Sequence, residues 1–562
     1  MNRRTFLRAS SAAAGAALFT REAVWAGDPG QAELLLRGAR IYDGTGAPPF
    51  EGEVAIAGGR IAAVGPRLQA SGARTIELRG LALAPGFIDI HSHTDLVLLV
   101  NPRAESKIRQ GVTTEVVGQD GSSIGPWAER QHARLREEYR AKYGVEIDFR
   151  DLTGFFRRID AQGAALNVAS MVGQGTIRGF VVGEDDRPAT EEELTRMREQ
   201  VREALAAGAC GLSTGLEYTP GASAGTAEIA ALAEALRGTG LPYASHMRNE
   251  DDALLGAVEE AITIGRRAGV PVQISHLKAQ GQRNWWKGEP VLDTIAAARE
   301  EGIDVMFDCY PYVAYSTGLA NLFPVRVRDG GTAAFLARLR DPAQRPGLEA
   351  AVREKIEQLG SWDAVQVTST HSDALAWARG RRLGELAAER REDPYALLVR
   401  LIVEDKDRAG MVGFGMSEEN VARKLSHPLA LVCSDGAAWA PYGPLSEGSP
   451  HPRTYGAFPR VLGHFCRERG VMPLEEAIHK MTGRPAARLR LEGRGRIAPG
   501  AFADLVAFDR DRVADRATFE APHRYPEGIP HVLVGGVFVI QDGEHTGALP
   551  GRVVRPGSEG LG

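Results

Sequence analysis

Short apolar runs alternate with amphipathic stretches over most of the chain. Eight of these runs end in polar or glycine residues, and most are followed by a segment with helical periodicity, such as 190–207 and 251–268. Continuous apolar strands that alternate with helices are typical of a parallel sheet, and eight such units predict a closed (β/α)₈ TIM-like barrel. The predicted strands end at His91-Ser92-His93, Gly118-Gln119-Asp120-Gly121, Gly173-Gln174-Gly175, Gly215-Leu216-Glu217-Tyr218, His246-Met247-Arg248, His276-Leu277-Lys278, Asp308-Cys309-Tyr310-Pro311 and Ser434-Asp435-Gly436.

The two ends of the chain show a different pattern, in which short alternating strands are separated by Gly and Pro. Neither end could bury its own apolar face, so residues 27–84 and 490–562 are expected to combine into one small β-sandwich domain. The barrel would then occupy 85–489. A long gap between the seventh and eighth strands, about 313–429, contains helical patterns and predicts an inserted cap beside the active site.

Length, composition and charge narrow the class of protein. A chain of 562 residues is too long for one compact core, and 43% hydrophobic with 25% charged residues is an ordinary globular balance. The net charge is −5 and no basic block occurs, which argues against a nucleic-acid or lipid partner and favours a small-molecule substrate. The four widely spaced cysteines fit buried apolar positions better than a disulfide framework. No feature indicates an oligomeric state.

The N-terminus has the pattern of a twin-arginine signal peptide over residues 1–26. Arg3-Arg4 precedes a short Ala-rich apolar stretch, and Val24-Trp25-Ala26 supplies small residues at the usual cleavage spacing. An ordinary signal peptide or a retained anchor is the alternative. No other segment approaches the roughly 18 apolar residues that a membrane helix needs, so we expect an exported, periplasmic protein without a stable membrane anchor.

Four histidines at predicted strand ends indicate a metal site. Active sites of (β/α)₈ barrels lie at the C-terminal ends of the strands. His91 and His93 are two residues apart on a strand and therefore leave the same face. His246 and His276 would add ligands from the fifth and sixth strands. Imidazole is a common zinc ligand, so the pattern predicts one or two bound divalent ions, Zn²⁺ first among them.

The sequence resembles the amidohydrolase superfamily and, within it, the D-aminoacylase branch, the N-acyl-D-amino-acid deacylases. The resemblance implies hydrolysis of the amide bond of N-acyl-D-amino acids by a metal-activated water, with Asp435 as general base and acid. It also implies substrate contacts from Lys278, Tyr310, Ser316 and Arg453. The motifs that carry it are the 85–95 run PGFIDIHSHTD, Gly111-Val112-Thr113-Thr114, Tyr218-Thr219-Pro220-Gly221, Ile274-Ser275-His276-Leu277-Lys278, Tyr310-Pro311-Tyr312, Ser434-Asp435-Gly436, His451-Pro452-Arg453 and Lys480-Met481-Thr482.

The chain departs from the branch at two strand ends. Asp120 stands where many such deacylases have a cysteine that bridges the metals, and a carboxylate can bridge two ions through its two oxygens. The alternative for Asp120 is an Asx turn before Gly121. Glu217 at the fourth strand is a second candidate bridge, since that strand has no lysine. Gln174 lies where relatives often have a histidine.

Selectivity and alternative functions follow from the same motifs. The segment 318–324 contains no cation, which favours a neutral or apolar D-side chain. A cyclic-amide hydrolase of the hydantoinase or dihydroorotase kind is an alternative, disfavoured by the missing strand-four lysine and by Lys278 with Arg453. A second alternative is a catalytically impaired relative that retains only metal binding; the retained Asp435 argues against it.

Overall fold

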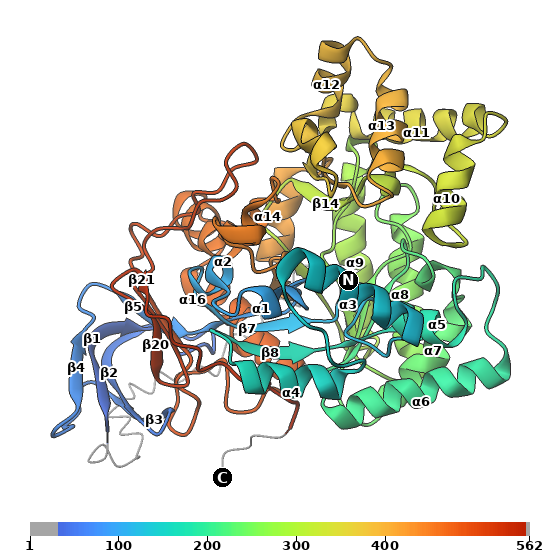
Figure 1. Ribbon diagram of the computed structural model, residues 1–562. Coiled ribbons are helices and arrows are strands. Elements are labelled where there is room, and N and C mark those ends of the chain that lie inside the picture. The colour runs from blue at the N-terminus through green and yellow to red at the C-terminus, as the bar shows by residue number, and fades with distance from the viewer. Residues whose placement is uncertain (1–31, 558–562) are drawn as a thin grey trace, which may run out of the picture.

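The computed structural model describes residues 32–557 and has an α/β architecture with a parallel-stranded centre (Figure 1). One parallel sheet runs β6-β7-β8, and β9 continues β8 after a single residue into a six-stranded sheet, β9-β10-β11-β12-β13-β17. A bridge between Ser92 and Gly436 links the segments that follow β6 and β17. The strands are β6 (Phe87–Asp89), β7 (Val112–Val117), β8 (Asn167–Ser170), β9 (Val172–Gly173), β10 (Leu212–Gly215), β11 (Tyr243–His246), β12 (Val272–Ile274), β13 (Val305–Cys309) and β17 (Ala430–Val432).

The helices between these strands follow from local sequence signals. The helix α6 (Glu191–Ala207) starts at a capping box of Thr190 and Glu193, and it ends at Gly208, whose φ of 106° suits only glycine. In α8 (Leu254–Ala268) the buried positions recur every three or four residues, as the predicted periodicity requires. The other helices of this layer are α1 (Val97–Val100), α2 (Glu105–Ile108), α3 (Glu129–Tyr143), α4 (Leu152–Gln162), α5 (Gln174–Val181), α7 (Thr226–Ala233), α9 (Gly288–Glu300), α14 (Glu418–Ser426), α15 (Arg453–Arg460), α16 (Leu474–Met481) and α17 (Gly483–Arg488).

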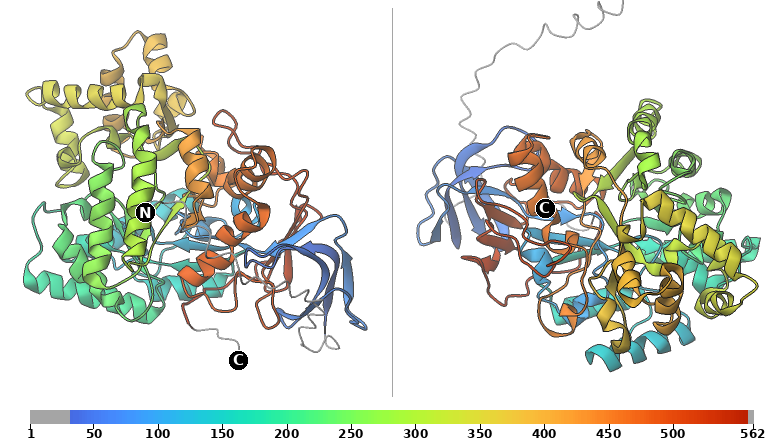
Figure 2. Two further views of the ribbon diagram at one scale, coloured as in Figure 1. Left: turned by 180° about the vertical axis from the view of Figure 1, so that it is seen from behind. Right: turned by 90° about the horizontal axis from the view of Figure 1, so that it is seen from above.

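Strands from both ends of the described chain form one further sheet. Its order is β21-β20-β19-β18-β5-β1-β2-β3, and β4 also pairs with β1. The antiparallel pairing of β18 with β5 joins the two ends, and the blue and red strands lie together on one side of the molecule (Figures 1 and 2). The bounds are β1 (Leu34–Ile41), β2 (Phe50–Ala57), β3 (Arg60–Gly65), β4 (Arg74–Glu77), β5 (Ala82–Pro85), β18 (Leu505–Phe508), β19 (His531–Val534), β20 (Val537–Gln541) and β21 (Glu544–His545).

The segment between β13 and β17 has its own small sheet and core. Strands β14 (Ala314–Gly318), β16 (Gly410–Phe414) and β15 (Val365–Ser369) pair antiparallel in the order β14-β16-β15. Four helices pack on them and project from the rest of the molecule, α10 (Gly331–Arg340), α11 (Arg345–Leu359), α12 (Leu383–Arg390) and α13 (Pro394–Glu404) (Figure 1). The apolar core of this segment extends as far as Met411. Helix α14 lies outside that core and packs against β13, β17 and α9.

The last described residues leave the sheet formed by the chain ends. Ala164 forms bridges with Pro550 and Gly551, and Val168 on β8 with Val553, so this stretch packs against the parallel centre. The predicted signal peptide lies outside the described residues. Within 32–557, no helix combines the length and apolar character needed to cross a membrane.

Candidate metal centre and active site

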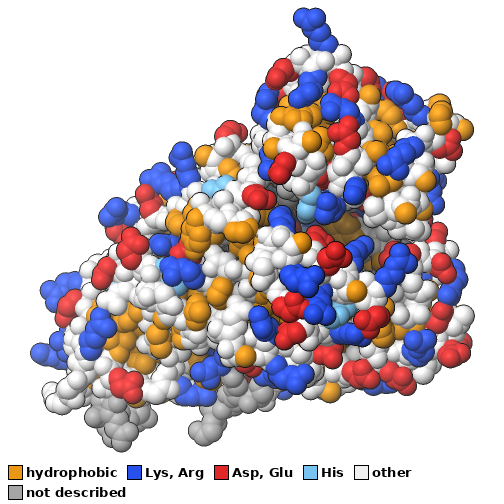
Figure 3. Space-filling view, in the orientation of Figure 1, with side chains coloured by type: hydrophobic (Ala, Val, Ile, Leu, Met, Phe, Trp, Pro, Cys, Tyr) orange, Lys and Arg blue, Asp and Glu red, His pale blue; other side chains and the backbone are white. Residues whose placement is uncertain are grey.

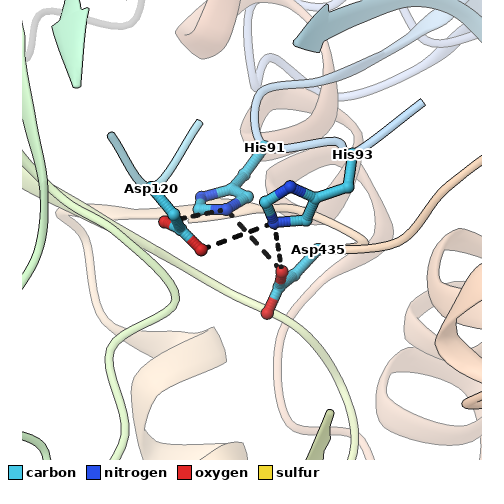
Figure 4. A group of neighbouring side chains, drawn as sticks. All are labelled: His91, His93, Asp120 and Asp435. Carbon is cyan, nitrogen blue, oxygen red and sulfur yellow. Dashed lines mark ion pairs between the residues drawn. The ribbon is translucent and has the colours of Figure 1, made fainter. Parts of the chain in front are cut away.

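Two histidines and two carboxylates converge where β6, β7 and β17 end (Figure 4). His91 and His93 follow β6, Asp120 follows β7 and Asp435 follows β17. The His93 Nε2 atom lies 3.0 Å from Oδ1 of Asp435 and 3.4 Å from Oδ2 of Asp120. His91 Nε2 lies 3.4 Å from Oδ1 of Asp120. The parallel strands therefore deliver all four side chains to one place.

Asp120 also belongs to a second group, with His246 and His276. Its Oδ2 atom lies 3.5 Å from His246 Nδ1 and 3.3 Å from His276 Nε2, and those two nitrogens are 2.9 Å apart. The Asp120 carboxylate is thus shared by both groups: Oδ2 faces His93, His246 and His276, and Oδ1 faces His91.

Backbone strain accompanies this arrangement. Asp120, His276 and Asp435 have positive φ angles of 53°, 33° and 52°, a region that residues other than glycine rarely adopt. Such conformations cost roughly 1–3 kcal/mol each and persist where the surroundings enforce them, often at functional sites. The Asp120 side chain does not form the alternative Asx turn, because its oxygens face the histidines.

The charged groups at the centre shift the pKa values of one another. Burial lowers the pKa of His91, but Asp120 and other carboxylates outweigh this and raise it to about 10. Burial likewise opposes a raised pKa at His93, which hydrogen bonding to Asp120 and Asp435 brings to about 9. Burial would raise the pKa of Asp120, yet the surrounding histidines hold it well below its usual range. The carboxylates of this centre therefore favour positive charge on the surrounding histidines.

Asp435 forms a buried ion pair with Arg453, the first residue of α15. The guanidinium Nη1 donates to Asp435 Oδ2 at 2.6 Å. Burial would raise the pKa of Asp435, but Arg453 and nearby histidines lower it strongly. Asp435 is thus a carboxylate at neutral pH, the form that a general base needs.

The predicted substrate contact Lys278 is engaged by a residue that sequence reasoning missed. Its Nζ lies 2.7 and 2.8 Å from the two oxygens of Glu250 and 2.6 Å from His276 Nδ1. Glu250 is buried and also accepts from Gln280. The loop after β11 carries Glu250 four residues beyond His246, so only the strand-end spacing could have suggested it.

The remaining predicted residues take different places. Ser316 on β14 lines the central cavity, whereas Tyr310 is buried behind Arg453, whose guanidinium lies 4.7 Å from its ring centre. Glu217 Oε2 lies 3.6 Å from Nε2 of His246, the nitrogen turned away from Asp120. Glu217 therefore stands outside the two histidine pairs and groups with His246 and Glu250 instead.

Two further polar residues at strand ends, Asp308 and Gln174, are buried. Asp308, at the end of β13, accepts a hydrogen bond from the His276 backbone nitrogen at 2.7 Å and lies 3.6 Å from Nδ1 of His91. Asp308 thus lies between the histidines that follow β6 and β12. Gln174 is buried, and its side-chain amide makes no hydrogen bond within the described chain.

A cavity of about 460 Å³ opens onto the centre, between the parallel strands and the projecting segment. Figure 3 shows this face hollowed below the projecting helices, with charged side chains of both signs at the rim. A second cavity of about 240 Å³ meets the first at His93, Ser316, Asp435 and Arg453. The first cavity also receives Lys355, from α11, and Asn321. The projecting segment thus supplies part of the wall, including a cation outside 318–324.

The chain is similar to known proteins over most of its length. The model of the family described as "Amidohydrolase family" matches residues 74–540. D-aminoacylase of Alcaligenes xylosoxydans xylosoxydans is 38% identical over 93% of this chain and 97% of its own, and N-acyl-D-aspartate deacylase of that organism is 40% identical over 94% and 96%. The structure of N-acyl-D-glutamate deacylase from Bordetella bronchiseptica, in complex with zinc and a phosphonate inhibitor, has a TM-score of 0.79 and 35% identity, covering 93% of this chain and all of that one.

Proposed function

Because this chain belongs to the amidohydrolase family, we propose that it is a metal-dependent hydrolase of the amide bond of N-acyl-D-amino acids. The products are a carboxylate and a free D-amino acid. The observation that carries the proposal is that Asp120 belongs both to a group with His91, His93 and Asp435 and to a group with His246 and His276. Asp435 lies beside this set, inside a cavity of suitable size for a small substrate.

The scaffold that fits the strand pairings is a (β/α)₈ barrel. Parallel pairs run without interruption from β6 to β17, with β9 continuing β8, and the Ser92–Gly436 bridge joins the two ends. We infer that the sheet from both chain ends is the small β-sandwich domain and that the segment between β13 and β17 is a cap over the cavity. The contribution of Lys355 and Asn321 to the cavity wall supports this role.

The donor set fits one or two zinc ions. Nε2 of His91 and Oδ1 of Asp120 are buried, lie 3.4 Å apart and make no hydrogen bond within the described chain. Buried polar atoms without partners are costly, and a metal ion would satisfy them together. His91, His93, Asp120, His246 and His276 would hold the metal. Zinc at such a site polarises a carbonyl and lowers the pKa of water.

Asp435 carries the proton in the proposed reaction. Its carboxylate accepts a proton from the attacking water and delivers that proton to the leaving nitrogen of the amide, which departs as a neutral amine. The contact between Arg453 and Asp435 Oδ2 leaves Oδ1 directed towards His93 and the cavity. Arg453 therefore fixes the orientation of the general base.

The cations at the cavity are suited to a substrate carboxylate. Lys278 and Arg453 both line the cavity, and Ser316, on β14 of the projecting segment, adds a hydroxyl. A carboxylate that enters this enclosed space loses hydration and needs compensating charge. Held by these groups, it would fix which face of the α-carbon meets the metal, and this selects D from L. Tyr310 packs its ring against the Arg453 guanidinium, and its buried hydroxyl, which makes no hydrogen bond within the described chain, is available to the same carboxylate.

Amide hydrolysis by the loaded and the stripped protein tests the proposal. The purified protein, dialysed against a chelator and then reloaded with zinc, is incubated with N-acetyl-D-methionine, and the free amino group is measured. We expect the zinc-loaded protein to hydrolyse N-acetyl-D-methionine, to lose this activity when the metal is removed and to regain it on reloading. Zinc-loaded protein that releases no amino acid from N-acetyl-D-methionine or other N-acetyl-D-amino acids would contradict it.

We also propose that the protein is exported with removal of about its first 26 residues. The support is the Arg3-Arg4 pair with the apolar run that follows it. Mass spectrometry of the protein from a bacterial host with a twin-arginine pathway tests this. A mature chain that begins near Gly27 in the periplasmic fraction is expected, and an intact Met1 in the cytoplasmic fraction would contradict it.

A further inference from the structure

A fully buried lysine, Lys107, lies next to the metal centre. It lines neither of the two cavities described above. Lys107, on the short helix α2, has no exposed side-chain surface. Its Nζ atom contacts four oxygens, Asp89 Oδ2 at 2.7 Å, Glu115 Oε1 at 2.9 Å, Ser434 Oγ at 2.6 Å and the Gly436 carbonyl at 2.8 Å. Burying an ammonium group is costly, so such complete engagement calls for an explanation.

Two of these four contacts are with the residues on either side of Asp435. Ser434 also donates its backbone N–H to Asp89 Oδ1 at 2.9 Å, and its Oγ accepts from the Gly436 N–H at 3.1 Å. Asp435 itself has a φ of 52°. The strained turn that presents the Asp435 carboxylate is therefore fixed at both ends. Lys107 contacts Ser434 and Gly436, and Asp89 contacts Ser434.

The same cluster reaches the metal-binding strand. Asp89 is the last residue of β6 and lies two residues before His91. Glu115 on β7 accepts from the hydroxyls of Ser92 at 2.7 Å and Thr94 at 2.8 Å, the two neighbours of His93. Lys107 thus ties together β6, β7 and the turn after β17, and the site residues that follow these strands are His91 and His93, Asp120, and Asp435.

We propose that Lys107 is a positioning residue that holds Asp435 in register with the metal ligands. The ammonium acts through the Ser434–Gly436 turn and does not touch the substrate. The inference rests on the proposed function, because it assigns Asp435 the role of general base. A displacement of about 1 Å at a reacting group can lower a rate by about a hundredfold, so even a small relaxation of this turn has a measurable effect.

A double-mutant cycle distinguishes positioning from general stability. Lys107→Met is made in the wild type and in Asp435→Asn, and kcat, KM, zinc content and Tm are measured for each zinc-loaded protein. The control is Lys480→Met, which removes an equally buried lysine whose Nζ contacts the carbonyls of Leu425 and His427 at 2.6 and 2.8 Å, away from the Asp435 turn. Both lysine variants are expected to lower Tm.

Positioning predicts that Lys107→Met lowers kcat about tenfold or more, with KM and zinc content within about twofold of wild type. In the Asp435→Asn background the same change should have almost no further effect on kcat, because no carboxylate remains to position. Lys480→Met should leave kcat unchanged. An equal loss in both backgrounds, or an unchanged kcat in folded Lys107→Met, would overturn the proposal.

A milder variant covers the case in which Lys107→Met does not fold. Ser434→Ala keeps the charges of Lys107, Asp89 and Glu115 and removes only the hydroxyl beside Asp435. It should lower kcat severalfold in the wild type and hardly at all in Asp435→Asn; an unchanged kcat would overturn the proposal. If wild type hydrolyses no N-acyl-D-amino acid, the proposed function fails by itself, and the cycle is run with whichever amide the enzyme does hydrolyse.

Discussion

The Arg453 guanidinium donates a hydrogen bond of 2.6 Å to Oδ2 of Asp435, and both side chains are buried beside the histidines. Arg453 is one of the groups that lower the pKa of Asp435 against the opposing effect of burial. Loss of the guanidinium must therefore raise this pKa.

In Arg453→Met, Asp435 should be protonated at a higher pH than in the wild type. Since the general base works only as a carboxylate, activity is lost as pH falls through this pKa, and the acid limb of kcat/KM should move to higher pH. Arg453→Lys, which keeps a positive charge, should shift the limb less. Coinciding acid limbs for all three proteins would mean that Arg453 does not control the protonation of Asp435.

Asp435→Asn should keep the fold and the bound zinc but lower kcat by about a hundredfold or more, the usual scale for loss of a positioned acid–base group. The amide retains the shape of the side chain and can still accept from Arg453. Steady-state kinetics with zinc analysis by mass spectrometry gives the measurement. Near-normal turnover of the zinc-replete variant would remove Asp435 from the mechanism.

Asp120→Ala should lower the number of zinc ions bound per chain, because this carboxylate faces both histidine pairs. Glu217→Gln is the matched control, since the Glu217 carboxylate lies 3.6 Å from the outer nitrogen of His246 and not beside Asp120; it should leave the stoichiometry unchanged. Elemental analysis after dialysis against dilute zinc measures both. A loss confined to Glu217→Gln would assign the bridge to that residue instead.

Parallel-strand geometry explains why much of this centre could be predicted. The C-terminal ends of parallel strands meet at one edge, so His91, Asp120, His276 and Asp435 come together although they are far apart in the sequence. The family was predicted from motifs such as the 85–95 run, and the α/β class from the alternation of apolar runs with helical segments; the comparisons confirm both.

Other features depend on contacts that no sequence pattern encodes. Glu250 lies in the loop after β11, and its pairing with Lys278 depends on how this loop meets the segment after β12. Lys107 reaches the Asp435 turn from a four-residue helix with no periodicity to mark its buried side. The cavity wall receives Lys355 from α11 of the projecting segment, a cation far along the chain from the segment 318–324.

A carboxylate clamp makes a prediction about substrate analogues. Arg453→Met should weaken hydrolysis of N-acetyl-D-amino acids by about 2 kcal/mol or more in kcat/KM beyond its effect on the corresponding carboxamides, since only the former leave a buried charge unpaired. The pairing of Arg453 with Asp435 lowers the rate for both substrate types, so the difference between them is the informative quantity. Equal losses would restrict Arg453 to its role beside Asp435.

The central claim is that this metal centre hydrolyses N-acyl-D-amino acids. The most direct measurement compares kcat/KM of the zinc-loaded protein for a panel of N-acetyl-D-amino acids, the matching L-forms and hydantoins bearing the same side chains. The account predicts turnover of one or more D-forms that exceeds the L-forms by at least about a hundredfold, with hydantoins left intact. Preferred hydrolysis of hydantoins, or equal rates for D- and L-forms, would contradict it.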